Sequence, residues 1–147
     1  MRLSNLADYA IVTMSAASRH CGKASLVDAD HKYRARTSAT ELAGETGLPL
    51  PTVQKLVSKL SAAGLLRATR GAGGGLQLAR PAAAISVADI VEAVEGPIAL
   101  TACIDGGECV VEHDCAVRPH WPVVNAALRG ALADISLAQL ARTEELA

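Results

Sequence analysis

The sequence predicts a mostly helical fold with one small β-hairpin. Apolar residues recur at helical spacing along much of the chain, and two short extended runs flank a single glycine-rich stretch. Aromatic residues make up only 2% of the 147 residues and Phe is absent, so Leu, Val, Ile and Ala must fill the core. That composition favours closely packed helices over a sandwich of strands, and the length suits one domain with an appendage.

The first helix is expected between Leu3 and Ala17. Apolar residues recur there at helical spacing, with no Gly or Pro between them. Residues 19–37 are rich in charge and follow no period, so we expect a loop over that range.

Two short helices are expected after this loop. Ser38 and Glu41 form a capping box, in which each side chain satisfies a free amide at the helix start, and Gly47 ends that helix. Pro51 suits the first position of the next helix, where its missing amide costs nothing. The expected buried stripe of that helix is Val53, Leu56, Val57 and Leu60.

A β-hairpin is expected after Gly64, which ends the third helix. Residues 65–70 and 76–80 are short extended runs, and residues 71–75 between them hold four glycines.

The remaining helices lie in the second half of the chain. One is expected to begin after Ser86 and to end at Gly96, and a longer one to cover residues 121–134. Ser136 and Gln139 resemble another capping box, which would open a short terminal helix. The apolar face of the longer helix is Val124, Ala127, Leu128, Ala131 and Leu132.

The order helix, short turn, helix, hairpin is that of a winged helix-turn-helix, whose second motif helix enters the DNA major groove. The outward face of that helix has hydroxyls, an amide and two cations, and no carboxylate that would repel phosphate. The candidate DNA-contacting residues on it are Thr52, Gln54, Lys55, Ser58 and Lys59. The alternative is the ordinary solvated face of an amphipathic helix.

The hairpin favours the DNA-binding interpretation. Arginines bracket its tip, and an Arg at such a place is drawn to the negative potential of a narrow minor groove. We expect this contact from Arg70, with little side-chain bulk at the tip to oppose it. The tip residues assigned to DNA are Arg70, Gly71, Gly73 and Gly74. A nucleotide-binding loop is disfavoured, because a strand rather than a helix follows the glycines.

Charge divides the chain into two unlike halves. Residues 1–80 hold eleven Lys or Arg against five Asp or Glu, a balance of +6, whereas residues 81–147 hold three against ten, a balance of −7. The basic half suits a polyanion. We therefore expect a winged helix-turn-helix DNA-binding region over 1–80, and a region with a different role over 81–147.

Three of the four cysteines are evenly spaced. Cys103, Cys109 and Cys115 form the pattern C-x5-C-x5-C in a region without helical period. We expect no secretory leader, and no apolar run is long enough to cross a membrane, so we expect a cytoplasmic protein with reduced thiols. Thiolates gathered on a loop favour an iron-sulfur cluster or zinc. Three unrelated buried cysteines, or an inducible disulfide, would also be compatible with this spacing.

A fourth ligand is not evident, because three thiols leave one coordination position open. The candidates are His113, His120, Cys21, a carboxylate or an external group. Even spacing of five is unusual for structural zinc, which prefers pairs two to four residues apart.

Several motifs together resemble one known family. They are the opening Leu3-Ser4 with Tyr9-Ala10, the wing from Arg70 to Gly75, the cysteine triad and Trp121 beyond it. In this order they are similar to the Rrf2 family of bacterial regulators, and to its IscR-like branch. The resemblance covers nearly the whole chain. The stretches 101–106 and 115–118, with Trp121 and 124–125, look most like the subgroup that regulates the SUF iron-sulfur assembly genes.

The resemblance implies a homodimeric winged-helix transcription factor, a repressor, with a [2Fe-2S] cluster on Cys103, Cys109 and Cys115. It implies major-groove contact by residues 52–59 and minor-groove contact by Arg70. Residues 81–147 would then comprise the cluster-binding loop and a dimerisation helix. This long helix would pack against that of its partner and place two recognition helices about one turn apart on palindromic double-stranded DNA.

The chain departs from the family pattern at Arg118. Cluster-binding relatives carry a His three residues after the last Cys, so the fourth ligand does not carry over. Residues 19–37 also form a longer loop than is usual, in which Cys21 and His31 are expected to be bystanders. A zinc-bound or thiol-switched repressor is the alternative. We expect no enzyme activity, because no nucleophile is paired with a base.

Overall fold

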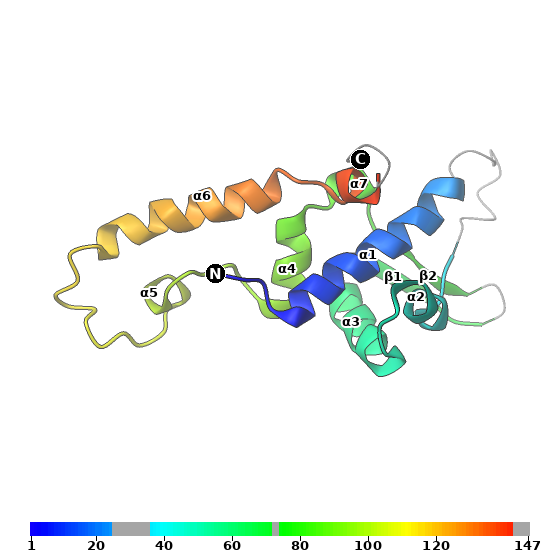
Figure 1. Ribbon diagram of the computed structural model, residues 1–147, viewed down its shortest axis with the longest axis horizontal. Coiled ribbons are helices and arrows are strands. Elements are labelled where there is room, and N and C mark those ends of the chain that lie inside the picture. The colour runs from blue at the N-terminus through cyan, green and yellow to red at the C-terminus, as the bar shows by residue number, and fades with distance from the viewer. Residues whose placement is uncertain (25–35, 72–73, 143–147) are drawn as a thin grey trace.

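The computed structural model describes residues 1–24, 36–71 and 74–142, and within this part it is mostly helical with one antiparallel hairpin, as predicted (Figure 1). The elements in chain order are α1 Asn5–Ala24, α2 Ala39–Thr46, α3 Leu50–Ala62, β1 Leu66–Thr69, β2 Gly75–Leu78, α4 Val87–Glu95, α5 Ala102–Asp105, α6 Trp121–Ala133 and α7 Leu137–Ala141. Short 3-10 turns cover Ala82–Ala84 and Arg118–His120.

The helices α1 to α4, the hairpin and α7 gather into one body, and α6 extends from it (Figure 1). The segment that contains α5 and the three cysteines lies at the far end of α6. The molecule therefore separates the hairpin from the cysteines by most of its length.

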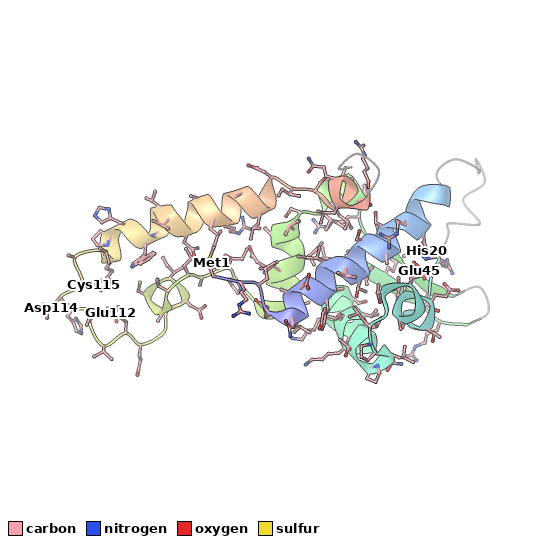
Figure 2. All side chains as sticks on the ribbon, viewed as in Figure 1. Met1, His20, Glu45, Glu112, Asp114 and Cys115 are labelled. Atoms are coloured by element: carbon pink, nitrogen blue, oxygen red, sulfur yellow. The ribbon has the colours of Figure 1, made fainter. Side chains whose placement is uncertain are left out.

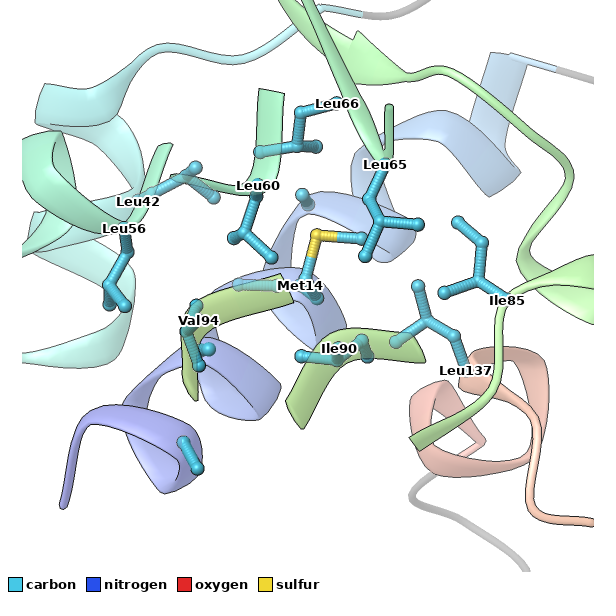
Figure 3. Close-up of a cluster of buried hydrophobic side chains, with 14 of the residues drawn as sticks. Met14, Leu42, Leu56, Leu60, Leu65, Leu66, Ile85, Ile90, Val94 and Leu137 are labelled. Carbon is cyan, nitrogen blue, oxygen red and sulfur yellow. The ribbon is translucent and has the colours of Figure 1, made fainter. Parts of the chain in front are cut away.

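The core is built from aliphatic side chains around α1, as the composition predicts (Figure 3). Met14 of α1 is fully buried, as are Leu60 of α3 and Ile90 of α4. Removing each large apolar side chain from water contributes roughly 1.5–3 kcal/mol, so the packing of α1 against α3 and α4 stabilises the body.

The core does not stop at residue 80. Ile85 and Leu137 are fully buried, and the amide of Leu137 donates to the carbonyl of Ile85 at 2.7 Å. The amide of Val87 donates to the carbonyl of Ile135 at 2.9 Å, so the chain returns to the body after α6. The body thus includes α4 and α7, and only α6 and the segment before it project.

The predicted helix caps are present. Ser38 and Glu41 form the reciprocal capping box of α2, and Gly47 ends that helix in the left-handed region with φ 74°. Ser136 and Gln139 make the same arrangement at α7. Pro51 lies at the second rather than the first helical position, because α3 begins at Leu50.

One boundary prediction was wrong. The expected loop over residues 19–37 overlaps α1, which continues to Ala24. The added turn contains no Pro, and His20 pairs with Glu45 of α2, so a tertiary contact supports helix where the sequence has no apolar period. His31 and the side chain of Cys21 lie outside the described residues. The short helix α5 was also not predicted.

Candidate nucleic-acid interface and cysteine loop

Helix α3 presents a polar face to solvent because its apolar stripe is buried. Val53, Leu56 and Leu60 are fully buried against the body. On the opposite side Gln54, Lys55 and Ser58 are exposed, and Thr52 is half-buried. Four of the five predicted DNA-facing side chains therefore share one accessible surface without a carboxylate.

Lys59, the fifth, lies differently. It is half-buried, and its Nζ donates to the main-chain carbonyl of Val94 at 3.3 Å. Val94 is in the last turn of α4, where unpaired carbonyls and the helix dipole favour a cation. Lys59 thus ties α3 to α4.

The turn between α2 and α3 is braced by a side chain. The hydroxyl of Thr46 donates to the carbonyl of Leu42 at 2.7 Å, and its oxygen accepts from the amide of Leu48 at 3.3 Å. This local bonding helps to fix the turn that joins α2 to α3.

The hairpin is pinned to the body by a third extended segment. Its register pairs Leu66 with Leu78 and Ala68 with Leu76. Thr37 and Leu76 exchange main-chain hydrogen bonds of 3.0 and 2.7 Å, so residue 37 forms a short extra rung beside β2. The outer strand β1 leaves Arg67 exposed.

Glycine is needed in the hairpin tip for the turn itself. Gly71 has φ 91°, and the amide of Gly74 donates to its carbonyl at 2.9 Å. A Cβ at Gly74 would lie 2.3 Å from the carbonyl oxygen of Thr69. Arg70 is exposed beside this turn, whereas Gly73 lies outside the described residues.

Arg80 turns away from the hairpin tip. Its guanidinium lies 3.7 Å from the carboxylate of Asp89 on α4. Arg80 is exposed as well, but it lies beyond the end of β2, so Arg67 and Arg70 are the exposed cations of the hairpin itself within the described chain.

The cysteine loop, residues 101–120, begins with α5. Gly106 ends this helix with φ 73°, and the amide of Gly107 donates to the carbonyl of Ala102 at 2.8 Å. The Sγ of Cys103 lies 3.1 Å from the hydroxyl oxygen of Thr101.

The other two cysteines lie in successive turns. The carbonyl of Cys109 accepts from the amide of Glu112 at 3.2 Å, and that of Cys115 accepts from Arg118 at 3.3 Å. All three cysteines are free thiols of intermediate exposure. Cys115 lies at the far end of the molecule, opposite the hairpin (Figure 2).

The donor chemistry of the loop fits an iron-sulfur cluster, because three free thiols occur within thirteen residues. The geometry does not gather them: among the described residues no three His, Cys, Asp or Glu side chains are placed to hold a metal ion. Arg118, at the departure from the family pattern, instead pairs with Glu112 at 2.8 Å.

Asn125 is the residue near this site that sequence reasoning missed. It is 9% exposed, and it is the buried residue of α6. Its Nδ2 donates to the carbonyl of Ile98 and its Oδ1 accepts from the amide of Leu100, both at 2.9 Å. An amide inside an apolar helical run was the available signal.

The predicted apolar face of α6 divides in two. Leu128 and Leu132 are half-buried, whereas Val124 is 46% exposed and Ala127 and Ala131 are exposed. Beside them Val123 is 73% exposed. Much of the apolar surface of α6 is uncovered in a single chain.

Comparison with known proteins relates this arrangement to regulators of transcription. The model of the Rrf2 family, described as "Iron-dependent Transcriptional regulator", matches residues 4–143. The HTH-type transcriptional regulator IscR of Vibrio atlanticus is 28% identical over 146 residues, which cover 99% of this chain and 78% of that protein. IscR of Klebsiella pneumoniae is 28% identical over 148 residues, covering 99% and 83%.

Two solved structures have the same architecture over nearly the whole chain. CymR of B. subtilis, a global cysteine regulator, superposes with a TM-score of 0.72 at 27% identity and covers 96% of each chain. IscR of T. potens superposes with a TM-score of 0.68 at 26% identity, covering 95% of this chain and 85% of that one.

Staphylococcus aureus CymR in its oxidised form has a TM-score of 0.68 at 28% identity, with 97% of each chain covered. These relatives are regulators rather than enzymes. None of the described helices has the length and apolar character needed to cross a bilayer.

Proposed function

The chain belongs to the Rrf2 family of transcriptional regulators, and from that premise we propose that it is a homodimeric repressor that senses iron-sulfur cluster status. It would bind a palindromic operator, hold a [2Fe-2S] cluster on Cys103, Cys109 and Cys115, and control iron-sulfur assembly genes of the SUF type. DNA binding and regulation of transcription follow from the family, and the cluster, dimer and operator are the proposed parts.

The observation that carries the proposal is the exposed face of α3 beside the arginine-bearing hairpin. Gln54 and Ser58 are exposed and can hydrogen-bond to base edges, and the exposed Lys55 can neutralise a phosphate. Arg70 next to the narrow glycine turn suits the minor groove. A reader helix and an adjacent wing are what sequence-specific binding by this fold requires.

The uncovered face of α6 supports the homodimer. Val123 and Val124 would leave water on pairing with the same face of a second copy, and a twofold axis makes such a contact self-complementary. Two copies would then present two α3 helices to half-sites about one helical turn apart, which requires a palindrome.

The three thiols support the cluster. When bound, a [2Fe-2S] cluster would supply iron that is coordinated by thiolates, sensitive to oxidation and readily lost. This chain's part is to present Cys103, Cys109 and Cys115 on turns that are partly open to solvent. Arg118 cannot join the donor set, because its guanidinium offers no lone pair, and it pairs instead with Glu112.

A thiol-based redox switch is the second candidate. The thiols are free and partly exposed, as oxidation requires, and one structural neighbour is a CymR solved in an oxidised form. On this alternative, disulfide formation within the loop would take the place of cluster loss.

The test is to purify the chain without oxygen and to measure its absorption spectrum together with iron, sulfide and zinc content. Operator binding is then measured by fluorescence anisotropy at one salt concentration for cluster-bound, cluster-free and peroxide-treated chain. The control is Cys21→Ala, which removes a thiol outside the triad, against Cys109→Ala within it.

Visible charge-transfer absorption, matched iron and sulfide, and a changed operator affinity after cluster loss would support the cluster sensor. Colourless protein whose affinity changes only with peroxide would favour the thiol switch. Equal affinity in all three states would refute both.

A further inference from the structure

The polar side chain of Asn125 lies where α6 otherwise offers apolar surface. A buried carboxamide is costly unless its donor and acceptor are both used. Here both are used on one short segment, with Nδ2 on the carbonyl of Ile98 and Oδ1 on the amide of Leu100. Asn125 therefore binds the main chain just before α5 and Cys103.

The other end of the cysteine loop is also attached to α6. The carbonyl of Cys115 accepts from the amide of Arg118, the first residue of the 3-10 turn that runs directly into Trp121. Cys103 is thus linked to α6 through residues 98–100, and Cys115 through the turn that leads into α6, whereas Cys109 lies between them.

We propose that Asn125 is a positioning residue for the three-cysteine site, and that it fixes Cys103 relative to α6. The proposal rests on the proposed function, because it concerns the three-cysteine site that is proposed to hold the cluster. It identifies Asn125 as the residue that couples this site to α6, the helix expected to form the dimer. Asn125 acts through the main chain at residues 98–100 and does not itself coordinate anything.

The order of residues along the chain explains why the loss of Asn125 should affect Cys103 more than the other cysteines. Leu100 is followed by Thr101, the residue that precedes α5 and whose hydroxyl contacts the Cys103 thiol. Releasing residues 98–100 frees the start of α5 together with that contact. Cys115 keeps its own attachment through Arg118.

The experiment measures the alkylation rate of each thiol by mass spectrometry, using iodoacetamide on the metal-free, reduced full chain. Asn125→Leu removes both hydrogen bonds at similar volume, and Asn125→Asp keeps the acceptor for Leu100 alone. The matched control is Arg129→Leu, which breaks a contact between α6 and Glu92 of α4 but leaves the loop attachments. Circular dichroism checks that each variant is folded.

We expect Asn125→Leu to speed alkylation of Cys103 about fivefold, as losing hydrogen bonds that close a segment should, with Cys115 unchanged. Asn125→Asp keeps the acceptor for Leu100 but puts a carboxylate against the carbonyl of Ile98, so it should also speed alkylation of Cys103. Arg129→Leu should match the wild type. Unchanged Cys103 reactivity in a folded variant, or equal acceleration of all three thiols, would overturn the proposal. If Asn125→Leu does not fold, Asn125→Asp decides by the same criterion.

A second readout separates this inference from the proposed function. If the wild type takes up iron and sulfide, Asn125→Leu should shorten the lifetime of its visible absorption in air, and Arg129→Leu should not. If the wild type takes up no cluster, the proposed function fails, while the thiol pattern still decides whether Asn125 positions Cys103.

Discussion

The ammonium of Lys59 on α3 donates to the carbonyl of Val94 in the last turn of α4, with a Nζ to oxygen distance of 3.3 Å. Two residues later, at Gly96, the chain leaves α4 towards the cysteine loop. The proposed DNA-reading helix therefore contacts the element from which the proposed sensing segment departs.

This contact predicts different roles for the two lysines of α3. Lys55→Ala should reduce the slope of log affinity against log salt concentration by about 1 for each protomer, because each protomer loses one contact that neutralises a phosphate. Lys59→Ala should change that slope less, since its ammonium already has a carbonyl partner. The measurement is operator binding by fluorescence anisotropy across a salt series.

Stability provides the control for the two lysines. Lys59→Ala should lower the free energy of unfolding by about 1 kcal/mol through the lost bond to Val94, and Lys55→Ala should leave it nearly unchanged. Equal salt slopes for both variants would contradict this assignment.

Features set by neighbours in the sequence were predictable, because they depend on a few adjacent residues. The capping box of Ser38 and Glu41 formed as expected, since its two hydrogen bonds are local. The hairpin was also found, although Gly75 belongs to β2 rather than to the tip.

Features set by tertiary contacts were not predictable in the same way. The C-terminal part of α1 is supported by the pairing of His20 with Glu45, which lies twenty-five residues further along the chain. Lys59 and Asn125 find main-chain partners that no periodic pattern identifies. Helical period could place an apolar stripe on α6, but it could not tell which part faces the body.

Serines at two helices should separate stability from DNA contact. Ser38→Ala removes the side chain that accepts from the amide of Glu41, so we expect a loss of about 1 kcal/mol with little change in operator affinity per folded chain. Ser58→Ala, on the exposed face of α3, should weaken operator binding and leave the free energy of unfolding nearly unchanged. Urea unfolding and anisotropy measured on both variants check this, and a stability loss for Ser58→Ala would count against its placement.

The glycine turn of the hairpin gives a further prediction. Gly74→Ala forces a Cβ to within 2.3 Å of the Thr69 carbonyl, so the turn must distort at a cost of at least about 1 kcal/mol. We expect weaker operator binding with it. The control Gly44→Ala meets nothing within 4 Å in the middle of α2 and should stabilise the chain by about 0.5–1 kcal/mol. Urea titrations and anisotropy read out both effects.

The exposed face of α6 predicts how the proposed dimer can be broken. Val123→Glu would put charges into the proposed interface, so the dissociation constant of the dimer should rise at least about tenfold. Sedimentation velocity over a concentration series measures it. Val110→Glu, the same change at a fully exposed position in the cysteine loop, is the control and should leave self-association intact. Dimers of undiminished strength in Val123→Glu would place the interface elsewhere.

The pairing of Arg118 with Glu112 allows the missing ligand to be tested. The pair is largely exposed, with side chains 50% and 33% accessible, so Arg118→Ala should change stability by less than about 1 kcal/mol. Arg118→His breaks the same pair but adds a nitrogen donor at the position where the family pattern has a His. If a cluster forms on the three cysteines, its visible absorption should persist longer in air in Arg118→His than in the wild type or in Arg118→Ala. Equal lifetimes in the two variants would mean that position 118 does not reach the site, and that another group completes the coordination.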